Sequence, residues 1–537
     1  MKSTIYLKSL FTITTLRLFC LLLIGLIMSS CNEVHYEGIP SPVIFTPNIP
    51  VDVDPVLQNE LKAAGDIYQL NQAYNLYSWQ ALIAINWPMT DDGIPKPNFT
   101  DAGSPAWLGW KEAFQVYRED GQQPAAWGSP RIQTGLGLTS SLLKDSDSRV
   151  ILSTRTPTQP AHHNLADETD QAFAGKLFDQ NGEVVVYEVL MNEVEFDYIV
   201  ANKLYNLNGQ LEFTKTQTEA NFPKGNYDNG TLGATEIKLA WRVFKSTDLH
   251  QDRYLTDEGY IIDEVTGQPK QVRLGLIGFH ISQKTPTGKQ WVWSTFEHID
   301  NLDENVIIGA DGKTTVIHPT LTDPDCEICP VNVDATNGNS TYKHQSSEHS
   351  DYWTITGDTN NYYAASDTMK TQSKRMVDIP VRVREINRKM QDYFKAQGSV
   401  WQYYQLIDTQ YPLDQNAKPA TSTATAYHLP ESVINKSGGV PNIAYLTNIT
   451  METFFQDGNQ IAGLMENSTS EGTVLPLSIF GTESCIGCHS SAGIAVSYDS
   501  TTSAPKFGGQ LSGDFSWLLK RANWDISLPK PTVKAEE

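Results

Sequence analysis

Apolar residues recur along the chain with two different periods, and the helical period predicts three helices. Apolar positions at helical spacing extend over residues 57–85 until Pro88 interrupts them. Residues 105–118 show a second amphipathic pattern, with a serine before it and a proline at its start. A third pattern covers residues 380–395, where the apolar side chains share one face and Gly398 follows the end.

Between these helical stretches the pattern favours β-strands. β-Branched and aromatic residues are concentrated in 184–189, 236–244, 273–282 and 290–298. Turn residues at 285–288 separate the last two segments, which predicts an antiparallel pair. We therefore expect the α+β class, with a central antiparallel sheet and flanking helices.

The N-terminus has the features of an export signal. Residues 1–30 combine three basic residues with an apolar run at 18–27 that is too short for a permanent membrane span. Small residues lead directly to Cys31, as in the lipobox of bacterial lipoproteins, so we expect Cys31 to carry a lipid. Asn32 favours the outer membrane, with the protein facing the periplasm or the cell surface. A plain signal peptide with an incidental cysteine is the alternative.

Composition divides the rest of the chain into three parts. Residues 31–60 contain five prolines and little amphipathic pattern, which indicates a semi-extended tether. Residues 61–375 hold the predicted sheet and form an α+β body, which ends in a polar loop at 335–373. Residues 376–537 form a helical and irregular region that packs either separately or as one unit with the body.

The charge balance is acidic. The chain has 537 residues, 40 of them Lys or Arg and 62 Asp or Glu, and 40% are hydrophobic, as in ordinary globular proteins. Removal of residues 1–30 takes away three basic and no acidic residues, so the net charge changes from −22 to −25. Because phosphate recognition needs a basic face, nucleic-acid binding is not expected. Motifs of nucleotide-binding proteins and serine hydrolases are absent from the sequence as well.

The strongest chemical signal is a C-x-x-C-H motif formed by Cys485, Cys488 and His489. On one helical turn, positions i, i+3 and i+4 share a face, so two thiols can reach the vinyl groups of one haem while the imidazole meets its iron. This is the attachment signature of c-type cytochromes, and we expect one covalent haem c with His489 as the metal ligand. The alternatives are a zinc site, which needs a fourth ligand from elsewhere, and a simple disulfide.

Any sixth ligand that the chain supplies to the iron has to precede the motif, because neither Met nor His follows His489. A thioether would raise the reduction potential relative to a second imidazole, whereas an open position would allow small-molecule binding or peroxide chemistry. The sequence leaves the position open or offers five candidates: Met451, Met465, His428, His280 and His298.

Six segments resemble a group of large bacterial monohaem cytochrome c family proteins: YSWQALIAINWP, EIKLAWRVF, GLIGFHISQKT, WVWSTFEHIDN, YYQLIDTQYP and SCIGCHSSAG. The resemblance runs in scattered blocks across residues 74–496, and it carries only the three residues of the C-x-x-C-H motif over as functional. It implies a haem but no particular substrate. Four residues are candidates for the wall of a haem pocket, with an ordinary strand core as the alternative: Trp291, Trp293, Phe296 and His298.

A second C-x-x-C pair, Cys326 and Cys329, lacks the histidine and is therefore not a second haem site. In an oxidising compartment we expect it to form a local disulfide. A redox-active dithiol, or a metal site that includes His318, is the alternative.

Together these features predict an extracytoplasmic, lipid-anchored c-type cytochrome that transfers electrons. Its partner would be a redox protein or a small-molecule electron donor or acceptor. Two other functions stay open, because a simple carrier needs only about a hundred residues. One is a haem-dependent oxidoreductase with an open sixth position, and the other is a surface interaction protein that holds haem for structure.

Overall fold

The structure is a computed structural model that describes residues 43–129, 150–151, 177–262, 269–309, 311–324, 332, 354–355, 362–363, 372–417, 420–421, 433–435, 439–443, 445–453 and 485–528. The chain divides into a unit of residues 1–44 and a unit of residues 45–537. The predicted signal, with Cys31 and the rest of the tether up to residue 42, lies outside the described residues. No helix within the described residues is both long and apolar enough to cross a membrane.

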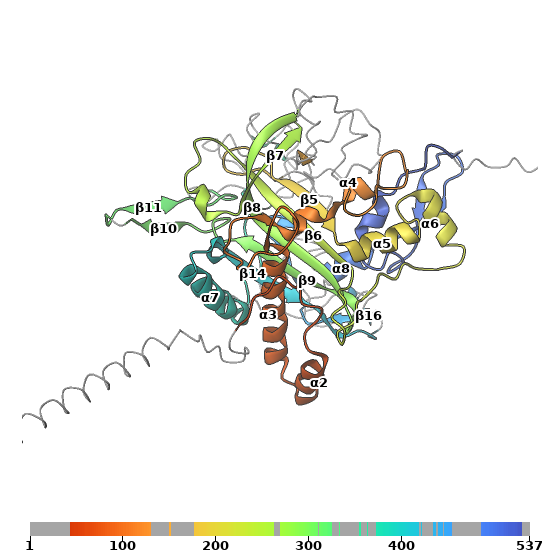
Figure 1. The fold of residues 1–537 in the computed structure, drawn as a ribbon, viewed down its shortest axis with the longest axis horizontal. Coiled ribbons are helices and arrows are strands. Elements are labelled where there is room, and N and C mark those ends of the chain that lie inside the picture. Colours follow the sequence, from red (N-terminus) through yellow and green to blue (C-terminus); the bar gives the residue numbers. More distant parts are fainter. Residues whose placement is uncertain are drawn as a thin grey trace, which may run out of the picture. The chain divides into compact units, whose positions relative to one another are not determined.

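A mixed sheet, almost entirely antiparallel, forms the centre of the second unit (Figure 1). Its main path runs in the order β14-β9-β8-β6-β5-β3, and β7 pairs with β8 beside this path. The one parallel pairing joins β4 to β7. The strands are β3 (Lys111–Glu112), β4 (Val150–Ile151), β5 (Val186–Met191), β6 (Thr235–Phe244), β7 (Thr256–Ile262), β8 (Pro269–Thr285), β9 (Gly288–His298) and β14 (Tyr404–Gln410). The predicted α+β class with a central antiparallel sheet and flanking helices is confirmed.

Smaller strands form two-stranded pairs around this sheet. The pairs are β1 (Pro88–Met89) with β2 (Ser104–Pro105), β10 (Asn305–Ile308) with β11 (Thr314–Ile317), β12 (Thr354–Ile355) with β13 (Tyr362–Tyr363), β15 (Pro412–Asp414) with β18 (Val440–Pro441), β16 (Ala420–Thr421) with β17 (Val433–Asn435), and β19 (Ala495–Tyr498) with β20 (Pro505–Phe507). All of these pairs are antiparallel.

Two of the three predicted helices are present. The first pattern forms α2 (Pro55–Ala64) and α3 (Ile67–Ile85), because Gly65 adopts φ +71° and ends α2 in a left-handed C-cap. The third forms α7 (Val381–Ala396). The remaining short helices are η1 (Ala106–Gly109), α4 (Ala113–Val116), α5 (Glu193–Ala201), α6 (Leu207–Phe213), η3 (Gln251–Arg253), η4 (Val400–Tyr403), α8 (Cys485–His489) and η7 (Trp517–Arg521).

The single helix predicted for residues 105–118 is wrong. The chain there forms η1, then β3, then α4. Lys111 and Glu112 pair with Met191 and Leu190 of β5, so sheet pairing interrupts the amphipathic pattern. Tertiary pairing has overridden a helical periodicity that was real but short.

Residues on the N-terminal side of α2 pack against the body as well. Asp52 accepts hydrogen bonds from the amide and the hydroxyl of Thr287, at 2.9 and 2.8 Å. Gln283 donates to the carbonyl of Pro50 at 2.8 Å. The packed part of the chain therefore begins well before residue 60.

The two faces of the sheet have different covers. On one face α3 crosses the strands (Figure 1), where Ser78 hydrogen-bonds to Ser294 and Thr409 and the Trp79 ring lies 5.0 Å from Phe296. On the other face lie residues 445–453 and α8, as the 2.7 Å hydrogen bond from the Tyr187 hydroxyl to the Thr450 carbonyl illustrates. Because successive side chains of a strand point to opposite faces, each one faces either α3 or the layer of residues 445–453 and α8.

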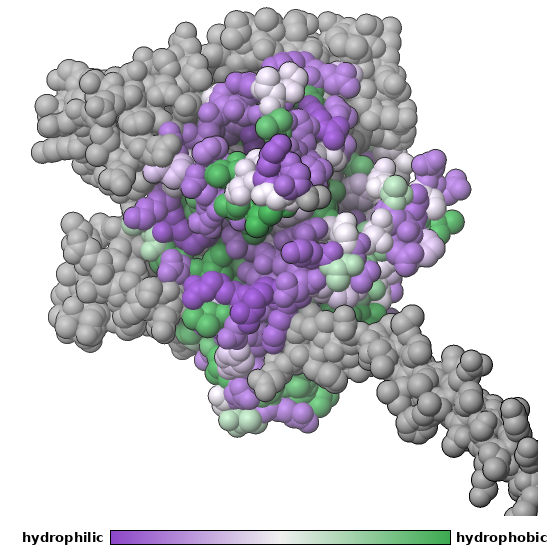
Figure 2. Space-filling view, turned by 90° about the vertical axis from the view of Figure 1, so that its left-hand side faces the viewer, coloured by the Kyte–Doolittle hydropathy of each residue, from purple (hydrophilic) through white to green (hydrophobic). Residues whose placement is uncertain are grey.

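The C-terminal segment closes over this second face. In Figure 1 the blue segment lies beside α6, and Gln210 of α6 donates to the carbonyl of Leu519 and accepts from the amide of Ala495. On the face seen in Figure 2, most of the described surface is hydrophilic, and apolar residues form separate groups. The hydrogen bonds of Gln210 make the C-terminal segment, which begins with the helix of the C-x-x-C-H motif, part of a packed layer.

Candidate functional site

The C-x-x-C-H motif lies entirely within α8, as its spacing predicts. Cys485 is buried, while Cys488 and His489 are partly buried. Both cysteines are thiols and are not joined in a disulfide. Burial raises the pKa of the Cys485 thiol well above its usual value, and the nearby Glu452 carboxylate raises it further.

Strand β14 holds the start of α8 in place. Gln410, its last residue, accepts a hydrogen bond from the amide of Ile486 at 2.8 Å and donates to the carbonyl of Ile443 at 2.8 Å. This side chain satisfies one of the amides that a helix start leaves without an intrahelical partner. At the other end, Ser490 and Ser491 donate backbone hydrogen bonds into α8. The motif is therefore anchored to the sheet at its first turn.

The His489 ring has a defined protonation pattern. Its Nδ1 lies 2.7 Å from the carbonyl oxygen of Phe515. A carbonyl only accepts hydrogen bonds, so Nδ1 carries the hydrogen and donates, which leaves the lone pair on Nε2. Burial lowers the pKa of His489 to about 4, so the ring is neutral at physiological pH. Neutral imidazole with an available Nε2 is the form that binds a metal.

Polar residues of the sheet face the same side as α8. On β8, His280 pairs with Lys238 of β6 and with Thr295 of β9, which places the three side chains in one row. Trp293 lies two residues before Thr295 and therefore shares this face. The Trp293 ring centroid is 6.0 Å from that of His489. The row that contains His280 thus adjoins the C-x-x-C-H motif.

Glu452 connects the covering segment to this row. Its Oε1 lies 3.5 Å from Nε2 of His280, and its Oε2 accepts a 2.7 Å hydrogen bond from the amide of Asn448. Burial alone would raise the pKa of Glu452, but His280, Lys238 and the Asn448 amide outweigh it and lower the pKa below its usual value. Glu452 is therefore an anionic carboxylate next to His280.

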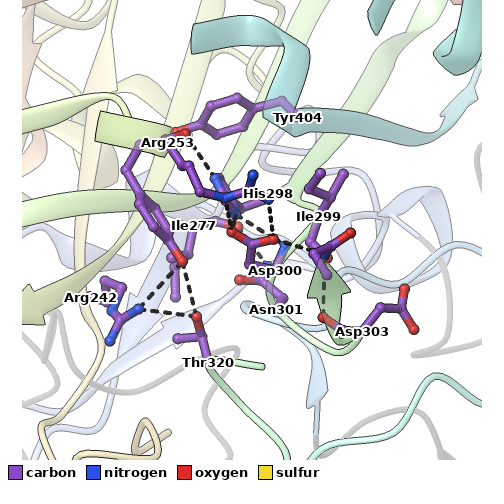
Figure 3. Close-up of polar contacts among 12 residues, drawn as sticks. Arg242, Arg253, Ile277, His298, Ile299, Asp300, Asn301, Asp303, Thr320 and Tyr404 are labelled. Carbon is purple, nitrogen blue, oxygen red and sulfur yellow. Dashed lines mark hydrogen bonds and ion pairs between the residues drawn. The ribbon is translucent and has the colours of Figure 1, made fainter. Parts of the chain in front are cut away.

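His298 belongs to a separate polar cluster (Figure 3). Its Nε2 lies 3.0 Å from the carbonyl of Arg253, and its Nδ1 accepts from the amide of Asp300 at 3.1 Å. The ring stacks on Tyr254 with centroids 3.9 Å apart. Burial lowers the pKa of His298 to about 4. With both ring nitrogens in hydrogen bonds, His298 has a structural role here and no lone pair left for a metal.

The other candidates for a sixth ligand are placed as follows. Met451 is fully buried in a hydrophobic cluster that includes Tyr187 and Ile449. Met465 and His428 lie outside the described residues.

Strand alternation separates the aromatic residues that are candidates for a haem pocket wall. Trp293 faces the motif, and its ring lies 5.6 Å from Phe515. Trp291 shares that face and donates to the carbonyl of Asp514 at 2.8 Å. Phe296 points to the other face, against Trp79. Of the four candidates, the two tryptophans are the ones that lie on the side of α8.

The structure describes only part of the second predicted cysteine or metal site. Cys326 and Cys329 lie outside them, so the predicted disulfide stays a prediction. His318 is exposed, with its Nδ1 3.2 Å from Glu304. Within the part of the chain that the structure describes, no three His, Cys, Asp or Glu side chains converge as ligands of one metal ion.

Three residues of the site were not found from the sequence. Gln410, Glu452 and Phe515 carry no motif, and each acts through a hydrogen bond or charge that only the fold brings close to α8 or His280. An alternation pattern on β9 does point Trp293 and Thr295 to a common face, and this signal could have narrowed the candidates.

Comparison of the chain with protein-family models, with curated proteins and with solved structures found no match.

Proposed function

We propose that this chain is an extracytoplasmic, lipid-anchored c-type cytochrome that carries one covalent haem c and transfers electrons. Cys485 and Cys488 would hold the haem through thioethers, and His489 would ligate its iron. The observation that carries the proposal is the His489–Phe515 hydrogen bond, which leaves Nε2 of a neutral imidazole available at the end of a C-x-x-C-H helix.

The donor set fits this cofactor. Haem c supplies one-electron chemistry between ferrous and ferric iron when it is bound. The chain's own contribution is to fix the proximal ring through Phe515, to anchor α8 through Gln410, and to exclude water with Trp293. Exclusion of water and second-sphere hydrogen bonds are the means by which a protein sets a reduction potential.

The anchor and the charge suggest where the protein works. A lipid on Cys31 would hold it at the outer membrane, and the preceding residues would be removed with the signal. The mature chain would carry a net charge of −25. Such a surface steers basic redox partners toward the protein at low ionic strength.

Haem attachment can be tested with the full chain expressed in cells that assemble c-type cytochromes. We expect haem to stay with the polypeptide on a denaturing gel, with thioether-linked haem in the absorption spectrum. The variant C485S/C488S should lose this haem, whereas Ser491→Ala, one turn away, should keep it. A wild-type chain without covalent haem, or a double variant that retains it, would refute the proposal.

A further inference from the structure

His280 lies on the sheet face that α8 covers. We propose that His280 is the sixth ligand of the haem iron and that Glu452 orients its ring. This proposal rests on the proposed function, because it presupposes a haem held by Cys485, Cys488 and His489.

The position of His280 follows from the sheet. It lies on β8, is paired with Thr295, and shares a face with Trp293, whose ring is 6.0 Å from that of His489. Helix α8 contacts β9, so His280 and His489 lie on the same side of the sheet.

The surroundings of His280 suit a metal ligand. Its side chain is 14% exposed, and its buried Nε2 has no hydrogen bond, with Oε1 of Glu452 the neighbouring acceptor at 3.5 Å. Because Nε2 of His280 faces the Glu452 carboxylate, its hydrogen points there and Nδ1 is left as the basic nitrogen. A neighbouring carboxylate that fixes the ring in this way is how metal-binding histidines are usually held.

Other described side chains of this region are committed elsewhere. Met451 is enclosed in a hydrophobic cluster, and both nitrogens of His298 are hydrogen-bonded. The Lys238 ammonium lies 4.9 Å from the ring centroid of Tyr187. His280 is therefore the residue of the row with a nitrogen available for iron.

Imidazole as the sixth ligand has a functional consequence. Two nitrogen ligands stabilise ferric iron relative to a histidine and methionine pair, so the protein would be a carrier of comparatively low reduction potential. A filled sixth position also excludes peroxide and other small molecules from the iron. The inference thus favours electron transfer over an open-site oxidoreductase.

The test uses the purified, haem-bearing full chain and the variant His280→Ala. We expect a low-spin ferric EPR spectrum for the wild type, and a ferrous form that does not bind carbon monoxide. His280→Ala should become high-spin and bind carbon monoxide, and added imidazole should restore the low-spin spectrum. Met451→Leu, a volume-conserving change in the core, should leave the wild-type spectra unchanged.

The orienting role of Glu452 has its own readout. Glu452→Gln should stay low-spin, because the ligand is still present, but its reduction potential should rise with the loss of a negative charge near the ring. An unchanged potential and unchanged EPR g values in Glu452→Gln would remove this part of the proposal.

Failure of this inference can be told from failure of the proposed function. A wild-type protein that carries covalent haem but is high-spin and binds carbon monoxide refutes His280 as the ligand and leaves the cytochrome intact. A low-spin His280→Ala variant without added imidazole refutes it as well. If His280→Ala does not fold, the wild-type spectra together with those of His280→Gln decide the matter in the same way. Absence of covalent haem would overturn both proposals.

Discussion

His298 and His489 show how two neutral histidines come to have different roles. Burial lowers the pKa of both to about 4. His298 uses both ring nitrogens in hydrogen bonds and stacks on Tyr254. His489 uses one nitrogen, on the Phe515 carbonyl, and keeps the other. The number of nitrogens left over, and not the pKa, separates a structural histidine from a candidate ligand.

His298 should make the folded state sensitive to mild acid. Its pKa is lower in the folded chain than the 6.5 of an unfolded one, so the unfolded state binds more protons between pH 6.5 and pH 4. Its contribution to stability is fully present above pH 6.5 and is lost as the pH falls toward 4. The loss amounts to on the order of 3 kcal/mol.

The variant His298→Asn isolates this contribution. It should be about 2 kcal/mol less stable than the wild type at pH 7, because the Arg253 carbonyl loses its donor and the stack on Tyr254 is lost. The difference should shrink toward pH 4, as measured by chemical denaturation at several pH values. Buried carboxyls whose pKa is raised to about 6, and which act in the opposite direction, are common to both proteins: Asp179, Asp408 and Asp514. A constant difference across this range would contradict the assignment.

Gln410 should be important for α8 in particular. Gln410→Leu removes the acceptor of the buried Ile486 amide and the donor to the half-buried Ile443 carbonyl. We expect a loss of about 2–4 kcal/mol in the free energy of unfolding. Gln405→Leu, at a half-buried position on the same strand, is the matched control and should change stability by less than about 1 kcal/mol. Equal losses in the two variants would show that α8 does not depend on this contact.

At the scale of elements, the cover of the sheet by α3 should dominate stability. Trp79 is fully buried and its ring packs against Phe296 at 5.0 Å. Trp79→Ala should lower the free energy of unfolding by about 3–5 kcal/mol. Val56→Ala on α2, where the side chain is 65% exposed, should change it by less than about 0.5 kcal/mol. Urea denaturation of both variants measures the difference, and similar midpoints would contradict a core role for α3.

The strands that were predicted from the sequence are long enough to show a β-strand pattern or are next to clear turn residues. The segment 236–244 corresponds closely to β6 (Thr235–Phe244), and the turn at 285–288 joins β8 to β9. Strand β14 was not predicted, because nearly all of its side chains are buried and no alternation marks it. Its place at the edge of the path depends on β9, which lies far away in the sequence.

The site residues that could be predicted from the sequence are likewise those that depend on local spacing and not on distant contacts. Cys485, Cys488 and His489 were found because their chemistry depends on spacing within one helical turn. Five candidates for the sixth ligand could not be ranked, because the face to which His280 points depends on its register with Thr295. No sequence pattern marked Glu452, because the role of a single carboxylate depends on the residue next to it, and only the fold places Glu452 next to His280.

For the molecule as a whole, the C-terminal region and the body are interlocked. Strand β14 belongs to the same sheet as β5 and β6, which come from the body. Gln210 of α6 contacts Leu519 and Ala495 through its side-chain amide, and Leu207 donates to the carbonyl of Asn523. A change in α8 should therefore affect the unfolding of the entire unit.

Haem attachment should accordingly stabilise the whole protein. The variant C485S/C488S should retain the wild-type far-UV circular dichroism, because serine has nearly the shape of cysteine and α3 packs on the sheet face opposite to α8. Its Tm should be lower than that of the haem-bearing wild type, since a group bound to the native state alone stabilises it. Differential scanning calorimetry measures both, and equal Tm values would contradict this coupling.

Burial of the Cys485 thiol also has a consequence for the order of events in assembly. In the folded chain Cys485 is only 9% exposed, and burial raises its pKa, so the thiol is protonated and shielded. Bond formation with a vinyl group requires direct access to the sulfur. In the proposed cytochrome, attachment would therefore have to come before residues 485–528 close over the sheet, while the chain is still open. Folding would be the later step that seals the cofactor in, and a chain that folded first would have to unfold before it could mature.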